Sequence, residues 1–267
     1  MRLEFTKGHG TGNDFVVLDD PDGEVPLTSR LVAALCDRRF GVGGDGVLRV
    51  LRATEPGAQW FMDYWNSDGS LSEMCGNGVR VFARYLLEAG HVTGDGPIPI
   101  ATRAGLRTAY PEGPGFRVDM GAPRLLGTSK ATVAGVTYDG LGVSMGNPHL
   151  VCPVDSVAPL DLTRSPEFDA GLFPDGVNVE FAEVVDADHV RMRVYERGSG
   201  ETLSCGTGVC AVAVAHLHSA GRDTGQVTVD VPGGRLVATL DERTCWLAGP
   251  ALLVAHGFVD TDALRFL

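Results

Sequence analysis

The chain has 267 residues, of which 44% are apolar and 21% charged, so it can bury a sizeable core as one large domain or two smaller ones. Its formal net charge of −12 argues against a nucleic-acid-binding protein, because an acidic surface repels phosphate backbones. Only Lys7 and Lys130 are lysines, and neither follows the last glycine of a phosphate-binding loop. Both are also poor candidates for the Schiff-base lysine that a pyridoxal phosphate enzyme requires.

The N-terminal segment carries no apolar leader, and no apolar run approaches the roughly 18–20 residues needed to cross a bilayer. We therefore expect a soluble, cytoplasmic protein. In a reducing compartment its cysteines should remain thiols, and a buried or catalytic role is expected in place of a disulfide framework. The six cysteines are Cys36, Cys75, Cys152, Cys205, Cys210 and Cys245.

A helix-like stretch over residues 31–40 leads into a glycine-rich segment, residues 41–46, that contains the pattern G-x-G-x-x-G. In a dinucleotide-binding protein this pattern follows a strand and opens a helix. Here the helix comes first and a strand follows, so the context is reversed. We interpret the segment as a glycine-rich turn that could face a substrate.

Short apolar or alternating segments between glycine and proline turns predict strands along the whole chain. The clearest of them are residues 47–51, 60–65, 116–120, 190–195 and 227–231.

Two segments separated by 130 residues resemble one another. Residues 75–90 and 205–221 both begin Cys-Gly-x-Gly-Val, continue through an apolar run and end in Ala-Gly. Each is predicted to form a helix that ends at a glycine, and the second, from Val209 to Ala220, is apolar enough to be buried on most sides. A spacing of half the chain is typical of a duplicated domain.

We therefore expect an α+β fold of two pseudo-symmetric domains, each a curved and mostly antiparallel sheet wrapped around a central helix. The first domain, residues 1–120, would carry Cys75, and the second, residues 121–267, would carry Cys205. The last strand is a candidate to return to the first domain.

The cysteine at the start of each repeat is the candidate catalytic residue. A helix N-terminus favours the thiolate, and the following glycines leave backbone amides open to an anion. Two such units could face one another, so that one thiolate removes a proton from a carbon while the opposite thiol returns one, as in a two-base racemase or epimerase. Cys36, Cys152 and Cys245 are expected to be buried packing residues. Cys210 lies about 140° around the helix from Cys205 and is also assigned to packing.

Polar residues in turn-like settings form a second candidate set. An asparagine amide both donates and accepts, which suits an amino-acid ligand, although asparagine is also a common turn residue. Arg197 could bind a carboxylate and Glu196 an ammonium, or the two could form a surface ion pair. The asparagines are Asn13, Asn66, Asn147 and Asn178.

Together these segments resemble the diaminopimelate epimerase family. The matching stretches, which span nearly the whole chain in the family's order, are residues 10–15, 39–46, 66–78, 146–149, 177–179, 195–208 and 231–234. The resemblance implies interconversion of LL- and meso-diaminopimelate, in lysine and cell-wall precursor synthesis, without cofactor or metal. It also implies a fold shared with proline racemases, and a homodimer by analogy.

The resemblance further implies a role for each site residue. Cys75 and Cys205 would be the acid and base, flanked by His149 and Glu196. Backbone amides would hold the reacting carboxylate at Gly76, Asn77, Gly206 and Thr207. The distal end of the substrate would bind to Asn13, Asn66, Asn147, Asn178 and Arg197, with Glu196 as a further contact. Some family members carry glutamine where this chain has Gly46, which puts one distal contact in doubt.

Three other functions remain open on the residues alone. A racemase for proline-like acids would tolerate loss of the asparagine set. A cysteine hydrolase would pair Cys205 with His149 and leave Cys75 unused. A ligand-binding protein without activity would exchange no substrate proton with solvent.

Overall fold

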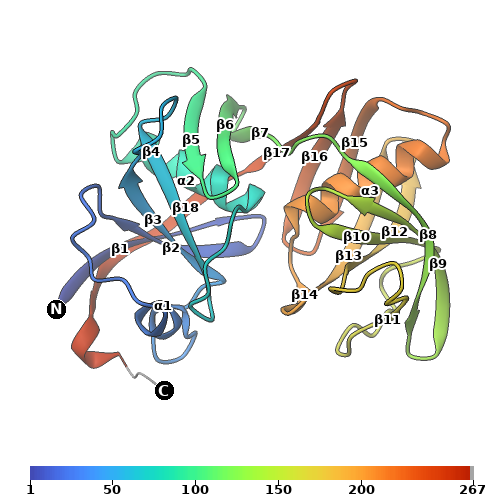
Figure 1. Cartoon of the computed structure of the whole chain (residues 1–267), viewed down its shortest axis with the longest axis horizontal. Helices are drawn as coiled ribbons and strands as arrows, with labels where there is room; N and C mark the ends of the chain where they lie inside the picture. The colour runs from blue at the N-terminus through green and yellow to red at the C-terminus, as the bar shows by residue number, and fades with distance from the viewer. Residues whose placement is uncertain (265–267) are drawn as a thin grey trace. The chain divides into compact units, whose positions relative to one another are not determined.

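The computed structural model describes residues 1–264 and divides them between two units (Figure 1). Unit 1 consists of residues 1–118 together with the C-terminal segment that starts at Gly249, and unit 2 consists of residues 119–248. The chain therefore leaves unit 1 once and returns to it for the final strand. Both boundaries fall within strands, β7 (Gly115–Asp119) and β17 (Cys245–Pro250).

Unit 1 is a mixed sheet in the order β18-β1-β2-β3-β4-β5-β6-β7, in which only the β2–β3 and β4–β5 pairs are parallel. Its other strands are β18 (Leu252–Asp260), β1 (Arg2–Gly10), β2 (Asn13–Asp19), β3 (Gly46–Arg52), β4 (Trp60–Asn66), β5 (Ile98–Thr102) and β6 (Gly105–Glu112).

Unit 2 forms a sheet in the order β8-β9-β10-β12-β13-β15-β16-β17, in which only the β10–β12 and β13–β15 pairs are parallel. Two short strands, β11 (Glu167–Phe168) and β14 (Gly200–Thr202), pair with β8 and β13. The remaining strands are β8 (Arg124–Val133), β9 (Val136–Ser144), β10 (Pro148–Val154), β12 (Asn178–Asp186), β13 (His189–Glu196), β15 (Gly225–Val231) and β16 (Gly234–Leu240).

The two sheets have the same sequence of parallel and antiparallel pairs when their strand orders are compared position by position. The C-terminal strand β18 stands in unit 1 where β8 stands in unit 2, so the final strand completes a copy of the fold that began at the N-terminus. Because the same two steps are parallel in each unit, the equivalence extends to single residues. Phe15 lies opposite Gly46 in unit 1 as His149 lies opposite Asn178 in unit 2.

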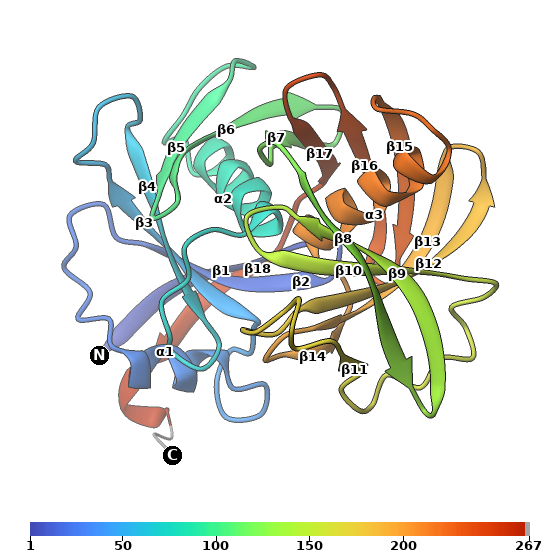
Figure 2. The same ribbon diagram turned by 45° about the vertical axis from the view of Figure 1, so that its right-hand side comes forward.

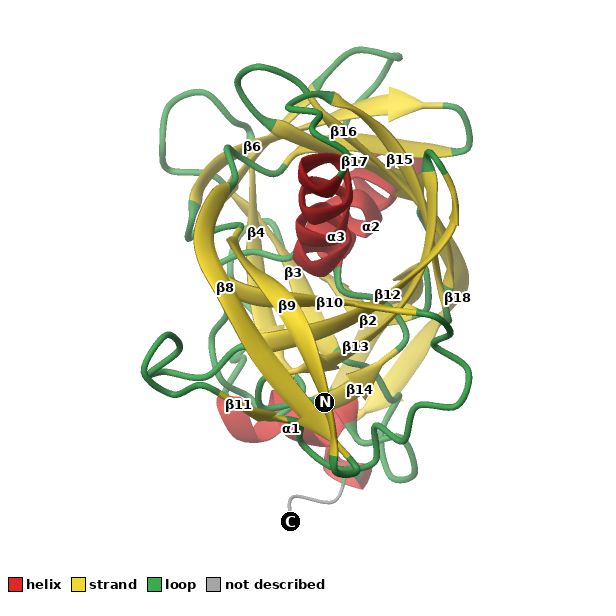
Figure 3. Ribbon diagram, turned by 90° about the vertical axis from the view of Figure 1, so that its right-hand side faces the viewer, coloured by secondary structure: helices red, strands yellow, loops and turns green. Residues whose placement is uncertain are grey.

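Each sheet packs around one helix, α2 (Gly76–Glu88) in unit 1 and α3 (Gly206–Ser219) in unit 2 (Figure 2). Helix α3 consists mainly of small apolar residues and is buried along most of its length, with β9 and β16 among the strands that line it (Figure 3). Helix α2 has a polar and an apolar side, and it packs against strands β1–β6 and β18. The expected α+β fold of two pseudo-symmetric units is thereby confirmed.

The third helix, α1 (Ser29–Cys36), is shorter than the stretch 31–40 predicted for it. Its N-cap is Thr28, whose hydroxyl accepts from the Leu31 amide. Asp37 ends the helix, because its carboxylate accepts from the amides of Arg39 and Phe40 and draws the backbone into a turn. The glycine-rich segment that follows is a loop into β3, as expected, and a short 3₁₀ helix (Thr261–Ala263) follows β18.

No helix in residues 1–264 combines the length and the apolar character needed to cross a bilayer.

Candidate active site

Cys75 is the N-cap of α2 and is half-buried. Its backbone is extended, with φ −141°, and its sulfur accepts from the Gly78 amide at 3.4 Å. The same sulfur lies 3.5 Å from Oδ1 of Asn13, at the start of β2. The amides of Gly76 and Asn77 precede the first hydrogen bond of the helix, from the Val79 amide to the Cys75 carbonyl, and so belong to the turn where helices bind anions.

A chain of hydrogen bonds with a fixed direction holds this thiol. Asn13 donates its Nδ2 to Oδ2 of Asp45 at 2.8 Å. A carboxylate only accepts, so Oδ1 of Asn13 must face Cys75, and it also accepts from Asn77 at 3.2 Å. Oδ1 of Asn77 accepts in turn from the buried guanidinium of Arg80 at 2.8 Å. Donors therefore run from Arg80 through both asparagines to Asp45, and the Cys75 thiol meets an acceptor.

Cys205 is the N-cap of α3 and is buried. Its sulfur lies 3.4 Å from the Thr207 hydroxyl, and the carboxyl group of Glu196, at the end of β13, is near enough to act on it electrostatically. The amides of Gly206 and Thr207 stand in the first turn, before the Val209-to-Cys205 bond that opens the helix. Unit 2 thus repeats the thiol and the amide turn of unit 1 with different neighbours.

The electrostatics of Cys205 differ from the lowering expected at a helix N-terminus. Burial, together with the nearby carboxylates of Glu196 and Glu180, raises the pKa of the Cys205 thiol well above its usual value. The Thr207 hydroxyl and the Gly208 amide act in the opposite direction but are outweighed. Burial likewise raises the pKa of Glu196, although Thr202 donates a hydrogen bond to its carboxylate. In this structure Cys205 is therefore held as a thiol.

His149, on β10, is completely buried. Its Nδ1 lies 2.6 Å from Oε1 of Glu180 on β12, and its Nε2 lies 3.1 Å from Oδ1 of Asn147. Nδ2 of Asn147 donates to the Thr207 hydroxyl at 3.4 Å. His149 is thus connected to Cys205 through two side chains of its own unit.

Three further residues of the predicted distal set lie at the end of a strand or directly after one. Asn66, at the end of β4, donates to the Ser70 hydroxyl at 2.9 Å. Asn178 donates to the Pro148 carbonyl and accepts from the Arg197 amide, so its side chain ties β10 to the turn after β13. Arg197 donates to the Asp175 carbonyl at 2.7 Å and forms no ion pair with Glu196 among the described residues.

The family model for diaminopimelate epimerase matches residues 5–126 and 141–254. Sequence relatives include diaminopimelate epimerases of Thermobifida fusca, 50% identical over 98% of this chain and 100% of the relative, and of Rhodococcus opacus, 48% identical over 97% of each. The diaminopimelate epimerase of Mycobacterium avium is also 48% identical, over 97% of this chain and 98% of the relative.

The chain belongs to the diaminopimelate epimerase family.

Solved structures show the same fold in proteins of other function. A phenazine biosynthesis protein of the PhzF family from Bacillus anthracis matches with a TM-score of 0.73 and 18% identity over 97% of this chain and 99% of its own. A hydroxyproline epimerase from Agrobacterium vitis matches with a TM-score of 0.70 and 16% identity over 97% and 92%.

Gly46 is the first residue of β3 and is buried. A Cβ atom on Gly46 would lie 2.4 Å from the Trp65 carbonyl oxygen, on the neighbouring strand β4. A side chain here would require β3 and β4 to separate, so this chain supplies no side chain to a ligand from position 46.

Sequence reasoning missed three residues that hold the cysteines in place, Arg80, Asp45 and Glu180. Arg80 is a buried charge five positions after Cys75, and Glu180 is the single acidic residue in the mainly apolar segment Val177–Ala182. A charge inside an apolar pattern is the signal that could have identified both, because buried charges require partners.

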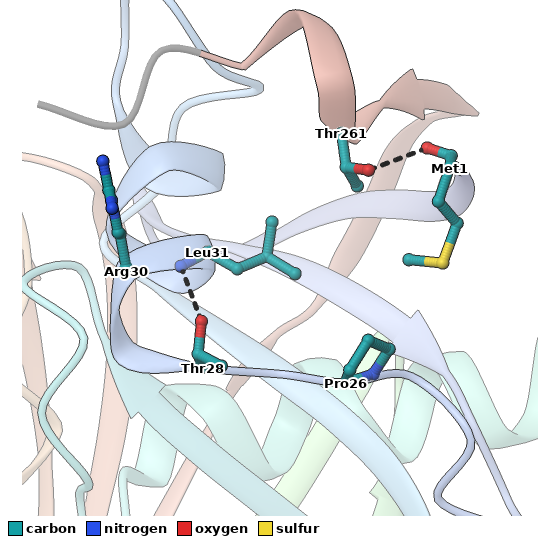
Figure 4. A pocket seen from close by; sticks show the side chains of 6 residues that line it. All are labelled: Met1, Pro26, Thr28, Arg30, Leu31 and Thr261. Atoms are coloured by element: carbon teal, nitrogen blue, oxygen red, sulfur yellow. Dashed lines mark hydrogen bonds between the residues drawn. The ribbon is translucent and has the colours of Figure 1, made fainter.

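Other features of the described chain lie apart from these residues. No group of three or more histidine, cysteine, aspartate or glutamate side chains in residues 1–264 is arranged to hold a metal ion. A hollow of about 380 Å³ opens beside the start of α1, between the helix cap at Thr28 and the residues Met1 and Thr261 (Figure 4). None of the predicted site residues lines it.

Proposed function

We propose that this chain interconverts LL- and meso-diaminopimelate, using Cys75 and Cys205 as acid and base on opposite faces of one carbon. The observation that carries the proposal is that each unit places a cysteine at the N-cap of its central helix, at equivalent positions of two equivalent sheets, in a chain of the diaminopimelate epimerase family.

The reaction balances without an oxidant. One thiolate takes the α-hydrogen as a proton and becomes S–H, while the electron pair of the broken C–H bond spreads into the adjoining carboxylate. The opposite thiol gives its proton to the other face of the carbon, which forms the new C–H bond and leaves a thiolate. Amide dipoles at Gly76, Asn77, Gly206 and Thr207 would stabilise the charge on the carboxylate.

Because its pKa is raised, Cys205 would be the proton donor in at least one direction of the reaction. His149 and Glu196 would flank the reacting centre, and the Glu196 carboxylate is near enough to Cys205 to raise the pKa of its thiol. The distal amino-acid end would bind Asn13, Asn66, Asn147, Asn178, Glu196 and Arg197. The proposal includes action without a cofactor, a cytoplasmic location and a homodimer.

The test is incubation of the full chain with LL-diaminopimelate in heavy water, following deuterium at Cα and formation of the meso isomer. Cys75→Ser and Cys205→Ser should each abolish epimerisation. Cys36→Ala is the matched control, because this thiol is packed in the core of unit 1 and burial raises its pKa to about 12. Full epimerisation by either serine variant, or no deuterium incorporation by the wild-type chain, would overturn the proposal.

A further inference from the structure

Unit 2 contains a buried histidine–carboxylate pair beneath the N-terminus of α3. His149 and Glu180 are both completely buried, and their contact of 2.6 Å is short enough for a strong hydrogen bond. The second oxygen of Glu180, Oε2, is buried without a hydrogen-bond partner among the described residues. A bare oxygen on a buried carboxylate is costly, so the pair should carry no net charge.

Unit 1 has apolar residues at the same two places. Phe15 is equivalent to His149 by strand register, and Leu48 lies two residues after Gly46 as Glu180 lies two after Asn178. The helices confirm the equivalence. A Cβ built on Gly78 would meet Leu48 at 3.4 Å and Phe15 at 3.6 Å, and a Cβ on Gly208 would meet Oε1 of Glu180 at 2.7 Å. The duplicated fold therefore does not require a charged pair here.

Neutrality of the pair fixes the protons along a path to Cys205. One proton lies between Nδ1 of His149 and Glu180, whichever atom formally holds it. A neutral pair then needs a second ring proton on Nε2, which is donated to Oδ1 of Asn147. With its oxygen so occupied, Asn147 presents Nδ2 to the Thr207 oxygen at 3.4 Å. The Thr207 hydroxyl proton is then directed to the Cys205 sulfur.

We propose that Glu180 is a positioning residue, which sets the ring protons of His149 and, through Asn147 and Thr207, gives the Cys205 sulfur a hydrogen-bond donor. The inference rests on the proposed two-thiol reaction for its catalytic consequence. A donor at the sulfur stabilises the thiolate that forms when Cys205 gives up its proton, and it offsets part of the repulsion from Glu196. The chain of contacts lies entirely within unit 2.

The electrostatic surroundings of Glu180 come from two neighbouring strands and one helix end. His149 and Cys152 face it from β10, Glu196 from the end of β13, and Cys205 from the N-cap of α3. Of these residues, only His149 can carry a positive charge and so balance the Glu180 carboxylate. Removing the Glu180 carboxyl group therefore acts on the protons of the His149 ring.

The experiment compares Glu180→Gln and Glu180→Leu in the full chain, with Glu183→Gln as control. Leucine reproduces the residue of unit 1, and glutamine keeps a hydrogen-bond partner but cannot share the proton. Glu183 lies on the same strand, where its carboxylate accepts from Arg191 and from the Val157 amide. The first readout is ¹⁵N NMR of the His149 ring at neutral pH, which requires no activity. The second is kcat and KM for epimerisation, with a far-UV spectrum to verify folding.

We expect a protonated Nε2 in the wild type and a changed ring ¹⁵N pattern in Glu180→Leu. We expect kcat to fall about 10- to 100-fold, less than the ~10²–10⁴-fold of a group that itself transfers the proton, with little change in KM. The kcat of Glu180→Gln should lie between those of the wild type and Glu180→Leu, and the kcat of the Glu183→Gln control should match the wild type. An unprotonated Nε2 in the wild type, unchanged ring shifts in the folded leucine variant, or its full kcat would overturn the inference. Absence of activity in the wild type would instead overturn the proposed function and leave the NMR result standing.

Discussion

Gly78 and Gly208 occupy the same position, three residues after the capping cysteine, but they face different chemistry. A Cβ on Gly78 would touch the apolar side chains of Leu48 and Phe15 at ordinary contact distances, whereas a Cβ on Gly208 would lie 2.7 Å from a Glu180 oxygen. Neither Gly78 nor Gly208 has a positive φ, so the backbone conformation does not require glycine at either position. The side chain that lies beneath the helix therefore decides which of the two glycines can be replaced.

This relationship predicts opposite outcomes for a matched pair of substitutions. Gly78→Ala should change the free energy of unfolding by less than about 1 kcal/mol, because the methyl group fits and alanine favours the helix. Gly208→Ala should cost about 1–3 kcal/mol and reduce kcat, since the methyl group displaces Glu180. Urea unfolding and the epimerase assay measure both. Equal effects of the two substitutions would contradict the prediction.

The buried guanidinium of Arg80 predicts a stability effect in unit 1. Arg80 donates to the carbonyls of Gly76 and Pro250 and to the Asn77 amide oxygen, so Arg80→Met should leave buried acceptors unsatisfied. We expect a loss of about 3 kcal/mol in the free energy of unfolding. Arg84→Met, one turn on and partly exposed, should cost less than half as much, and a larger loss there would argue against the assigned role.

The orientation of Asn13 predicts that Asp45, which contacts neither Cys75 nor Cys205, affects kcat. Asp45→Asn replaces the obligate acceptor by an amide, so only the contact from Asn77 then opposes a turn of Asn13 that brings its Nδ2 toward Cys75. We expect kcat to fall about tenfold with the fold intact, because the sulfur then meets a donor. Asp22→Asn, which removes only an exposed contact to Arg52, is the control. Wild-type kcat in Asp45→Asn would show that Asn13 holds its orientation without Asp45.

The sequence predicted the parts of this protein that repeat or match a local pattern. The two cysteine-capped helices were predicted because two segments 130 residues apart agree in start, length and end. A curved sheet around each helix follows from the alternating pattern of the strands. The pairing of β18 with β1 was only a candidate, because a register between chain ends has no local signal. Glu180 was missed because strand periodicity does not report which buried face lies under a helix. The raised pKa of Cys205 depends on burial and on carboxylates that the fold brings in from β12 and β13.

A last prediction concerns acid stability at the far end of unit 2. Two hydrogen bonds from Arg235 and one from His189 lower the pKa of Asp230 to about 2, below its unfolded value of ~3.9. The carboxylate therefore stabilises the folded state above pH ~4, and this contribution is lost as pH falls toward 2. Asp230→Asn should be about 0.5–1 kcal/mol less stable than the wild type near neutral pH, with the difference vanishing in acid. Asp139→Asn, on an exposed pair with Lys130, should differ from the wild type by less at every pH. A wild-type minus Asp230→Asn difference that stays constant from neutral to strongly acid pH would show that Asp230 has the same pKa folded and unfolded.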